Sequence, residues 1–538
     1  MTEQSQTAER RITTNNIEFA GRVIVLAAGL FLLTRNVTSE FTGWHEDNSA
    51  TFSVFARNHI QYGLGYTKLF NTWGDTAEPP AEPQRYLNQP PLLSIWTAIP
   101  MFVFGDHEWV ARSVPITTTL GSVLLLMIII SRLQSPILGL LSGLFYVTLP
   151  ATAYFGRMLC HESPVQFFSL LMLHGYLKWA GVYDGEYSRR TGILYYTLGT
   201  ILGIGTGWAV IIMAALVWLW HIGRVFSEQS SYKTLLWLTI IPVASVTAVI
   251  IHLLWGCEWN VKWVVPLLLS RTVGLTEPTW KQWFSANRMF LVQNVTVLGV
   301  GAAIIYLVVI AAALWNTAAN SLLRQIVRSK QSVIPILLTL VQGITWVVVL
   351  KHQSWMHDYW QYFVAPFFAV AMASVVMTIF VLLSGILPKT AKFITVILIL
   401  LPMPVFAGHL DLFHQNQFQD IHNVITVFRR ISQLAPPRVP VIITEKYTTY
   451  TPESLGSYKS HRYNGLVVYY TNRPLIYATD INQIESYRKE QGACIVLFTN
   501  ASELRRLKQQ LDDKYKMEQI NPNTFIYLLN QPKQITTP

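Results

Sequence analysis

The sequence is poor in charged residues and in cysteine. Only 13% of its 538 residues are Asp, Glu, Lys or Arg, whereas 51% are hydrophobic and 18 are tryptophan. Soluble globular domains carry about 25% charged residues, so this composition excludes an ordinary soluble domain. The three cysteines, Cys160, Cys257 and Cys494, are too few for a disulfide framework. We expect free thiols, with a bond between Cys160 and Cys257 as the alternative.

Several motifs are also missing. No small-residue cleavage site follows the first apolar run, so we expect an uncleaved first span and not a signal peptide. The polar segments hold no Asp-X-Asp or His-Glu-X-X-His motif for a tightly held metal. The net charge of +11 comes mostly from short basic segments between apolar runs and from the C-terminal region. It indicates contact with anionic lipids and not with nucleic acid.

Long apolar runs predict a polytopic α-helical membrane protein with about eleven spans. We place them at 17–34, 112–132, 135–152, 164–181, 191–205, 206–222, 234–255, 292–315, 333–350, 360–385 and 393–408. Lys and Arg fall in alternate connections, which the positive-inside rule assigns to the cytoplasm. The N-terminus is then cytoplasmic, and the segments with Glu46, Asp47 and Glu162, the 351–359 connection and the chain after about 408 lie outside. We expect a multi-pass protein of the cell membrane.

The chain divides into a membrane module, 1–408, and an extracytoplasmic α/β domain, 409–538. The first outer segment, 35–110, is expected to hold two juxtamembrane helices. One begins at Asp47 and lies on the membrane surface, and the other follows Pro90 and Pro91 over about fourteen apolar residues, too few to span. In the C-terminal domain we predict helices at 417–434, 481–490 and 503–514 and strands at 439–444, 465–470, 493–498 and 524–529.

The adjacent carboxylates Glu46 and Asp47 are the first candidate functional groups. Carboxylates between membrane spans are energetically unfavourable without a partner or a task. The helix that starts beside them places its positive dipole end at the pair, which favours the ionised form. Asp47 is therefore either a functional acid or only a helix cap.

Short motifs add a family resemblance. The acidic pair is followed by Ala-Arg-Asn (56–58), Tyr-Gly (62–63), a Pro-Pro-Leu segment (90–92) and Glu-Trp-Val-Ala-Arg-Ser-Val-Pro (108–115). Downstream stand Gly-Arg (156–157), Glu162, Lys-His (351–352) and His-Asp-Tyr-Trp-Gln-Tyr (357–362). Over about residues 17–410 the pattern resembles the GT-C fold glycosyltransferases, in the branch of the protein O-mannosyltransferases and lipid A aminoarabinose transferases.

The resemblance implies transfer of a sugar from a polyprenyl-phosphate donor to an acceptor on the outer face of the membrane. Such a displacement needs a carboxylate that takes the acceptor proton and cations that hold the departing phosphate. Asp47 is the expected base, with Glu46 as the substitute. Glu162 is the second acid; it orients the acceptor or binds a metal, or alternatively pairs with Arg157 or another nearby cation.

The candidate phosphate-binding residues are Arg85, Lys351, His357, Arg157 and Tyr359, with Arg271 and Arg288 in addition. Each cation has the alternative of snorkelling to lipid headgroups. Arg112 precedes a span and is expected to be structural.

The sequence also departs from the family pattern. Asn88 and Gln89 replace a Glu-Lys pair of the aminoarabinose transferases, and Thr206 replaces a lysine at the start of a span. These changes remove a metal ligand and two cations, which argues against lipid A modification by that enzyme's mechanism. A divalent cation is a possible cofactor, and its candidate ligands are Glu46, Asp47, Glu162 and His357.

Two other classes of function remain as alternatives. One is a transporter or flippase of lipid-linked sugars, and the other is a non-catalytic cell-envelope scaffold. Transporters tend to bury charges in mid-membrane and to show repeated halves, whereas here ionisable residues concentrate in outer segments and no repeat is found. The enzyme is therefore favoured. Its partners would be the lipid donor, membrane lipids and an acceptor that is a glycolipid, a polysaccharide or a protein hydroxyl.

Overall fold

The chain folds into two compact units, each built from separated segments. The structure is a computed structural model and describes residues 3–74, 79–81, 83–183, 188–259, 278–315, 330–415, 419–434, 439–443, 465–473, 475–478, 480–491, 495–499, 505–521 and 524–532. Unit 1 comprises Met1–Thr38, Asn88–Leu93 and Arg112–Gln415; unit 2 comprises Ser39–Leu87, Ser94–Ala111 and Asn416–Pro538. The first polar segment thus belongs to the same unit as the C-terminal residues. The domain boundary near residue 408 stays a prediction.

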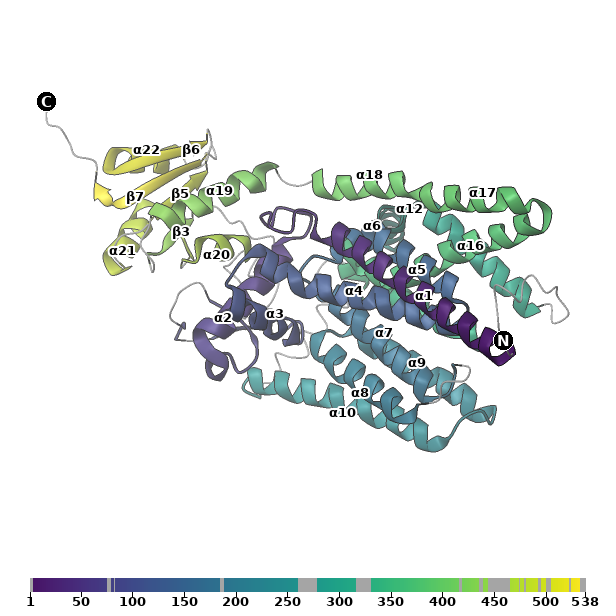
Figure 1. The fold of residues 1–538 in the computed structure, drawn as a ribbon. Helices are drawn as coiled ribbons and strands as arrows, with labels where there is room; N and C mark the ends of the chain where they lie inside the picture. Colours follow the sequence, from purple (N-terminus) through teal and green to yellow (C-terminus); the bar gives the residue numbers. More distant parts are fainter. Residues whose placement is uncertain are drawn as a thin grey trace, which may run out of the picture. The chain divides into compact units, whose positions relative to one another are not determined.

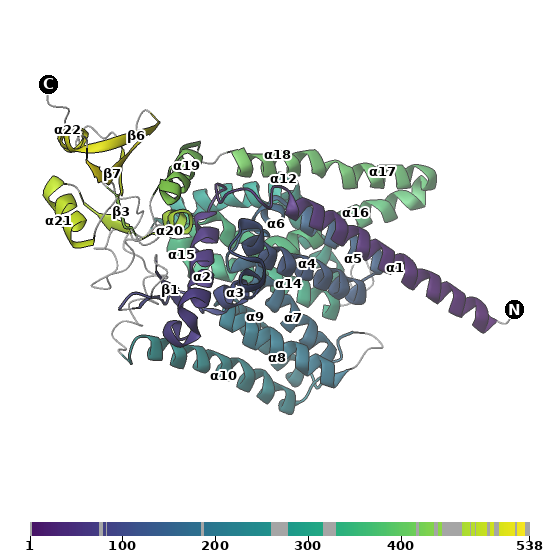
Figure 2. The ribbon, with the colours of Figure 1, turned by 60° about the vertical axis from the view of Figure 1, so that its left-hand side comes forward.

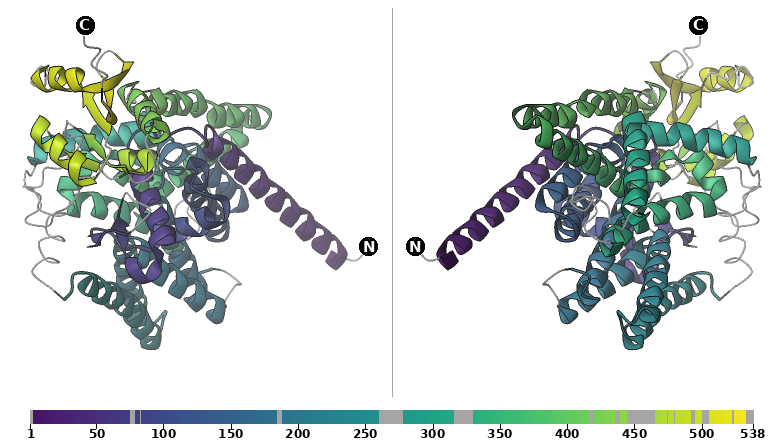
Figure 3. Two further views of the ribbon diagram at one scale, coloured as in Figure 1. Left: turned by 90° about the vertical axis from the view of Figure 1, so that its left-hand side faces the viewer. Right: turned by 90° about the vertical axis from the view of Figure 1, so that its right-hand side faces the viewer.

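Unit 1 is a helical bundle (Figure 1). Its elements are α1 (Glu3–Thr34), α4 (Glu108–Leu133, from Arg112 on), α5 (Pro136–Thr148), α6 (Pro150–Phe155), α7 (Glu162–Trp179), α8 (Arg189–Thr206), α9 (Ala209–Phe226), α10 (Tyr232–Gly256), α12 (Trp280–Trp315), α14 (Lys330–Val349), α15 (Lys351–Met356), the 3-10 helix η1 (Asp358–Val364), α16 (Ala365–Ile386), α17 (Pro388–Leu400) and α18 (Pro402–Gln415). Helix α5 packs on α1 and α16, and α14 packs on η1 and α9. Helices α17 and α18 run end to end (Figure 2), and the N-terminal half of α1 projects from the other helices of its unit (Figure 3).

Eight helices in the described part of the chain are long and apolar enough to cross a membrane. They are Asn16–Thr34, Glu108–Leu133, Ala209–Phe226, Tyr232–Gly256, Trp280–Ala313, Gln331–Val349, Asp358–Ile386 and Thr390–Phe413. Each matches one of the spans expected from the sequence. The other three expected spans coincide with α5, which has 13 residues, and with α7 and α8, which have 18 residues each. The total of eleven spans stays a prediction.

Glycines bring α7 and α8 into backbone contact. A Cβ atom at Gly175 would lie 2.2 Å from the Tyr196 nitrogen, and one at Gly192 would lie 2.5 Å from the Trp179 nitrogen. Small residues permit such close approach, which is how helices associate where lipid removes the hydrophobic driving force. Larger side chains at these positions would force the two helices apart.

Unit 2 contains the two helices expected in the first polar segment. Helix α2 (Asp47–Thr67) is followed by the strand pair β1 (Asn71–Trp73) and β2 (Gln84–Tyr86) and by α3 (Leu92–Phe104, from Ser94 on). Residues 49–59 of α2 are buried on nearly every side of the helix. Protein therefore covers both its apolar and its polar positions in this stretch, and its place at the membrane surface stays a prediction.

The C-terminal residues of unit 2 form a five-stranded sheet with helices. The strand order is β4 (Leu475–Tyr477), β3 (Val441–Ile443), β5 (Ile495–Thr499), β7 (Thr524–Pro532) and β6 (Tyr515–Asn521). Strand β3 is parallel to β4 and β5, and β7 is antiparallel to β5 and β6. The helices are α19 (Gln419–Leu434), α20 (Gly465–Thr471), α21 (Ile481–Gln491) and α22 (Arg505–Lys514). Ile442, Ile484, Val496, Leu511 and Tyr527 share a buried core.

One predicted strand is wrong. Residues 465–470 form part of helix α20, although Leu466, Val468, Tyr469 and Tyr470 are typical of strands. Tertiary contacts override this preference, since Gly465 packs directly against Thr51 of α2. Strands β4 and β6 were not predicted. Cys160 and Cys257 are buried free thiols, as expected, and Cys494 lies outside the described residues.

Candidate active site

The acidic pair lies where α2 begins. Glu46 is 2% exposed and its Oε2 accepts a hydrogen bond of 3.4 Å from the Gly43 backbone N–H. Asp47 is the first residue of the helix, and its side chain reaches solvent. The backbone just before the pair is in the left-handed region, since His45 has a φ of 58°, which is uncommon for a residue other than glycine. Glu46 is thus fixed by protein, whereas Asp47 remains accessible to a reactant.

The electrostatics of Asp47 differ from the expectation. The surrounding protein atoms displace water and raise the pKa of the Asp47 carboxyl, and this effect exceeds the lowering by His45 and by the backbone N–H of Asn48. Helix α2 does place its N-terminus at Asp47, but the expectation that this favours the ionised carboxylate overall is wrong, because the net change in the pKa is upward. A raised pKa makes the carboxylate a stronger base.

The second acid begins another helix. Glu162 is the first residue of α7 and is 6% exposed. Next to it, Ser163 Oγ lies 2.9 Å from Thr118 Oγ1 and 2.6 Å from Thr119 Oγ1. Thr119 Oγ1 also lies 3.2 Å from the Tyr362 hydroxyl of η1. These hydroxyl contacts fix the N-terminus of α7 and hence the position of the Glu162 backbone.

Three of the predicted phosphate ligands lie close together in sequence on α15 and η1. Lys351 begins α15 and its Nζ lies 4.6 Å from the centre of the Trp280 ring. The rings of His357 and Tyr359 are 5.1 Å apart, and Tyr359 is 5% exposed. Trp283 Nε1 donates to Ser354 Oγ at 2.8 Å, which anchors α15 to α12.

The other predicted cations have separate surroundings. Arg85 lies on β2 in unit 2 with its Cζ 5.6 Å from the Phe70 ring centre. Arg157 is 3% exposed and donates to the carbonyl of Arg35. Arg288 is exposed on α12, and Arg271 lies outside the described residues. Arg112 is completely buried and donates to the Val37 carbonyl at 2.8 Å, as befits a structural role.

The predicted residues are therefore divided between the two units. Unit 2 holds Glu46, Asp47 and Arg85, and unit 1 holds Glu162, Arg157, Lys351, His357 and Tyr359. A meeting of the two groups in one site stays a prediction. In the parts of the chain that the structure describes, no three His, Cys, Asp or Glu side chains gather to hold a metal ion.

Two functional candidates were missed in the sequence. Asp358, the first residue of η1, is 1% exposed, and its carbonyl accepts a hydrogen bond of 2.8 Å from Asn294 Nδ2. Arg57 in α2 is 5% exposed and forms an ion pair with Asp106, with 3.4 Å between Nη1 and Oδ2. Both lie inside the motifs that carry the family resemblance, at 56–58 and 357–362. A charged residue next to apolar ones was the feature of the sequence that could have identified them.

Comparison with known proteins supports the fold. No protein-family model matches the sequence, and no curated protein matches it. Among solved structures, ArnT from Cupriavidus metallidurans bound to undecaprenyl phosphate has a TM-score of 0.62 at 11% identity, covering 96% of this chain and 98% of that chain. The oligosaccharyltransferase AglB from Archaeoglobus fulgidus, in complex with an inhibitory peptide and a dolichol-phosphate, has a TM-score of 0.51 at 12% identity, covering 96% and 75%.

These likenesses concern the fold. Both proteins have the GT-C fold, so the fold expected from the motifs is confirmed over nearly the whole chain. Together with the eight apolar helices, the likeness identifies a multi-pass membrane protein.

Proposed function

We propose that this chain is an integral-membrane glycosyltransferase. It transfers a sugar from a polyprenyl-phosphate donor to the hydroxyl of a glycolipid, a polysaccharide or a protein on the non-cytoplasmic face of the cell membrane. The observation that carries the proposal is the fold likeness to ArnT, over 96% of this chain, in a structure that holds undecaprenyl phosphate. The N-terminus is then cytoplasmic, with eleven spans and an α/β domain outside the cytoplasm.

The proposed chemistry is a single displacement at the anomeric carbon. The acceptor oxygen forms a bond to that carbon as the bond to the phosphate oxygen breaks, and the electron pair leaves with the lipid phosphate. Asp47 takes the acceptor proton, which its accessible side chain and raised pKa favour. Glu162 orients the acceptor, since α7 fixes its backbone.

Cations stabilise the phosphate that departs. Lys351 and His357 stand close in sequence on anchored elements, and Tyr359 supports the His357 ring. Arg85 and Arg157 are the further ligands. Preorganised positive groups of this kind usually supply the largest share of the rate enhancement, because they require no rearrangement as charge develops.

The test is a transfer assay on the purified full-length protein in lipid nanodiscs. A panel of polyprenyl-phosphate sugars is supplied with each class of acceptor, and release of the free lipid phosphate is followed. We expect one donor to be consumed by the wild-type protein. Asp47→Asn should reduce the rate about 10²- to 10⁴-fold, the usual contribution of a general base, while donor binding persists.

Two variants control this result. Glu46→Gln tests the substitute base, and Asp513→Asn makes the same kind of change at an exposed acid of α22 and should have no effect. Movement of intact donor between leaflets without consumption would instead identify a flippase. Neither consumption nor movement of any donor would favour a scaffold, and wild-type activity in Asp47→Asn would remove Asp47 from the mechanism.

A further inference from the structure

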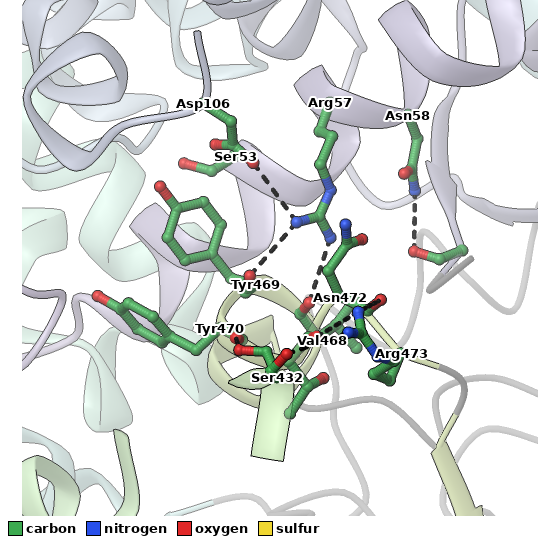
Figure 4. A network of polar contacts seen from close by, with 12 residues as sticks. Ser53, Arg57, Asn58, Asp106, Ser432, Val468, Tyr469, Tyr470, Asn472 and Arg473 are labelled. Atoms are coloured by element: carbon green, nitrogen blue, oxygen red, sulfur yellow. Dashed lines mark hydrogen bonds and ion pairs between the residues drawn. The ribbon is translucent and has the colours of Figure 1, made fainter. Parts of the chain in front are cut away.

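Arg57 is a charged residue buried ten positions after Asp47 in α2. Its Nη2 donates to the Val468 carbonyl at 3.2 Å and its Nη1 to the Tyr469 carbonyl at 3.3 Å (Figure 4). The Asp106 carboxylate is its third partner. Burial of a guanidinium is unfavourable unless such partners compensate the lost water. Two of the three partners belong to α20.

The two carbonyl partners of Arg57 on α20 lie at the C-terminal end of that helix. Val468 and Tyr469 lie in the last turn of α20, and Asn472 ends the helix in the left-handed conformation with a φ of 48°. The Val468 carbonyl also accepts the Asn472 backbone N–H at 3.0 Å, so Arg57 supplies a second donor there, and the carbonyl groups of a last turn carry the negative end of the helix dipole. The Arg57 fork is therefore matched to the C-terminus of α20 in both charge and hydrogen bonding.

The other end of α20 also touches α2. A Cβ atom at Gly465 would lie 2.8 Å from the Thr51 Cα and 2.1 Å from its Oγ1, so only glycine permits this approach. Helix α20 is thus held at both ends along the stretch of α2 between Thr51 and Arg57.

The loop that leads into α2 is held by the same C-terminal segment. The Tyr470 hydroxyl accepts a hydrogen bond of 2.7 Å from the Phe41 backbone N–H and donates to Glu108 Oε1 at 3.2 Å. Arg429 of α19 forms ion pairs of 3.0 Å with both Glu40 and Glu108. Contacts therefore flank Asp47 on both sides, through the loop before it and the helix after it.

We infer that Arg57 is a positioning residue for sugar transfer: by binding the carbonyl end of α20, it fixes α2 and thereby the direction of the Asp47 side chain. The inference rests on the proposed function of Asp47. Ten helical residues span about 15 Å, so Arg57 acts on Asp47 through the helix and not by contact. The C-terminal segment then has a part in catalysis although none of its own residues reacts.

The experiment compares two variants of the full-length protein in nanodiscs. Arg57→Met keeps the apolar stem and removes the donors, and Arg57→Lys restores one cation. For Arg57→Met we expect kcat to fall about 10- to 100-fold, the loss that follows from a misplaced catalytic group, with KM for the lipid donor unchanged. Hydrogen exchange of 465–471 should increase. Arg57→Lys should recover part of kcat.

A matched control and a second perturbation keep the test decisive. Arg430→Met removes an arginine of α19 that pairs with Glu518 at 2.7 Å, and it should leave kcat unchanged. Gly465→Ala forces α20 away from Thr51 without any substitution in α2. It should lower kcat as Arg57→Met is expected to do, and it tests the inference even if Arg57→Met fails to fold.

The outcomes separate the inference from the proposed function. Faster exchange of 465–471 with wild-type kcat would overturn the positioning role while leaving Asp47 as the base. A raised KM with unchanged kcat would make Arg57 a donor-binding residue and overturn it as well. If the wild-type protein transfers no sugar, the proposed function fails, and the inference fails with it.

Discussion

Acidification from pH 7 to pH 4 should destabilise unit 2 through His59. The imidazole is 3% exposed, with Nδ1 at 3.0 Å from Thr67 Oγ1 and Nε2 at 2.9 Å from Ser94 Oγ. Because Ser94 donates its only hydroxyl proton to Asn71 Oδ1 at 2.6 Å, it accepts from Nε2. The ring is neutral, with its hydrogen on Nε2, when the Thr67 hydroxyl directs its proton to Nδ1 and not to the Gly63 carbonyl, which lies 3.2 Å from Thr67 Oγ1.

The magnitude follows from the pKa. Burial lowers the pKa of His59 from 6.5 to about 4. Between these values the unfolded ring binds a proton that the folded ring does not bind, so the free energy of unfolding falls by about 1.4 kcal/mol for each pH unit of acidification. The whole window corresponds to about 3 kcal/mol. The stabilisation is complete above pH 6.5 and is lost below pH 4.

Hydrogen exchange of the α2 amides measures this loss in the full-length protein, after correction for the intrinsic rate at each pH. His59→Gln keeps a donor and an acceptor but does not titrate, so between pH 6.5 and pH 4 the wild type should lose about 3 kcal/mol of stability relative to this variant. His107→Gln changes an exposed histidine of the same unit and should keep the wild-type slope. A flat wild-type profile between pH 6.5 and 4, or an NMR titration of His59 near 6.5, would refute the reasoning.

Three further predictions concern activity and packing. As pH falls, kcat/KM should decrease with an apparent pKa above 3.8, the ordinary value of an aspartate carboxyl, because Asp47 becomes protonated. The residual activity of Asp47→Asn should not show this decrease. Gly192→Leu should lower the melting temperature because it forces α8 from α7, an overpacking effect of about 1 to 3 kcal/mol, whereas Gly223→Leu, which meets open space, should not. Lys351→Gln should weaken the binding of undecaprenyl phosphate, the departing group, in a thermal-shift titration, and unchanged affinity would exclude Lys351 as a phosphate ligand.

Much of the fold could be predicted because its causes are local. Apolar runs long enough to cross a bilayer mark helices whatever their neighbours are, and eight of them reappear as candidate spans. Helices α2 and α3 could be predicted because Asp47 is a residue type that starts helices and because an apolar run follows Pro90. Helix α20 could not be predicted, since Val468 and Tyr469 favour a strand and only contacts with α2 make it helical.

The candidate site divides in the same way. Asp47 and Glu162 could be selected because carboxylates between apolar segments stand out in the sequence. Two of the three partners of Arg57 could not, since they are main-chain carbonyls 411 and 412 residues away. Any residue type can present a carbonyl, so no side-chain pattern announces this contact.

The pKa of Asp47 shows why a local rule can fail at a site. A helix N-terminus stabilises a carboxylate by about 0.3 to 1 kcal/mol at the surface, less than one pKa unit. Desolvation of a carboxyl surrounded by protein can exceed that several-fold, and it is the largest contribution for Asp47. The helix dipole can be inferred from the sequence, whereas the extent of desolvation depends on how the chain folds around Asp47. A base must hold its charge near neutrality and bind a proton in the transition state. Desolvation therefore adjusts the strength of Asp47 as a base, and the helix end chiefly sets its position.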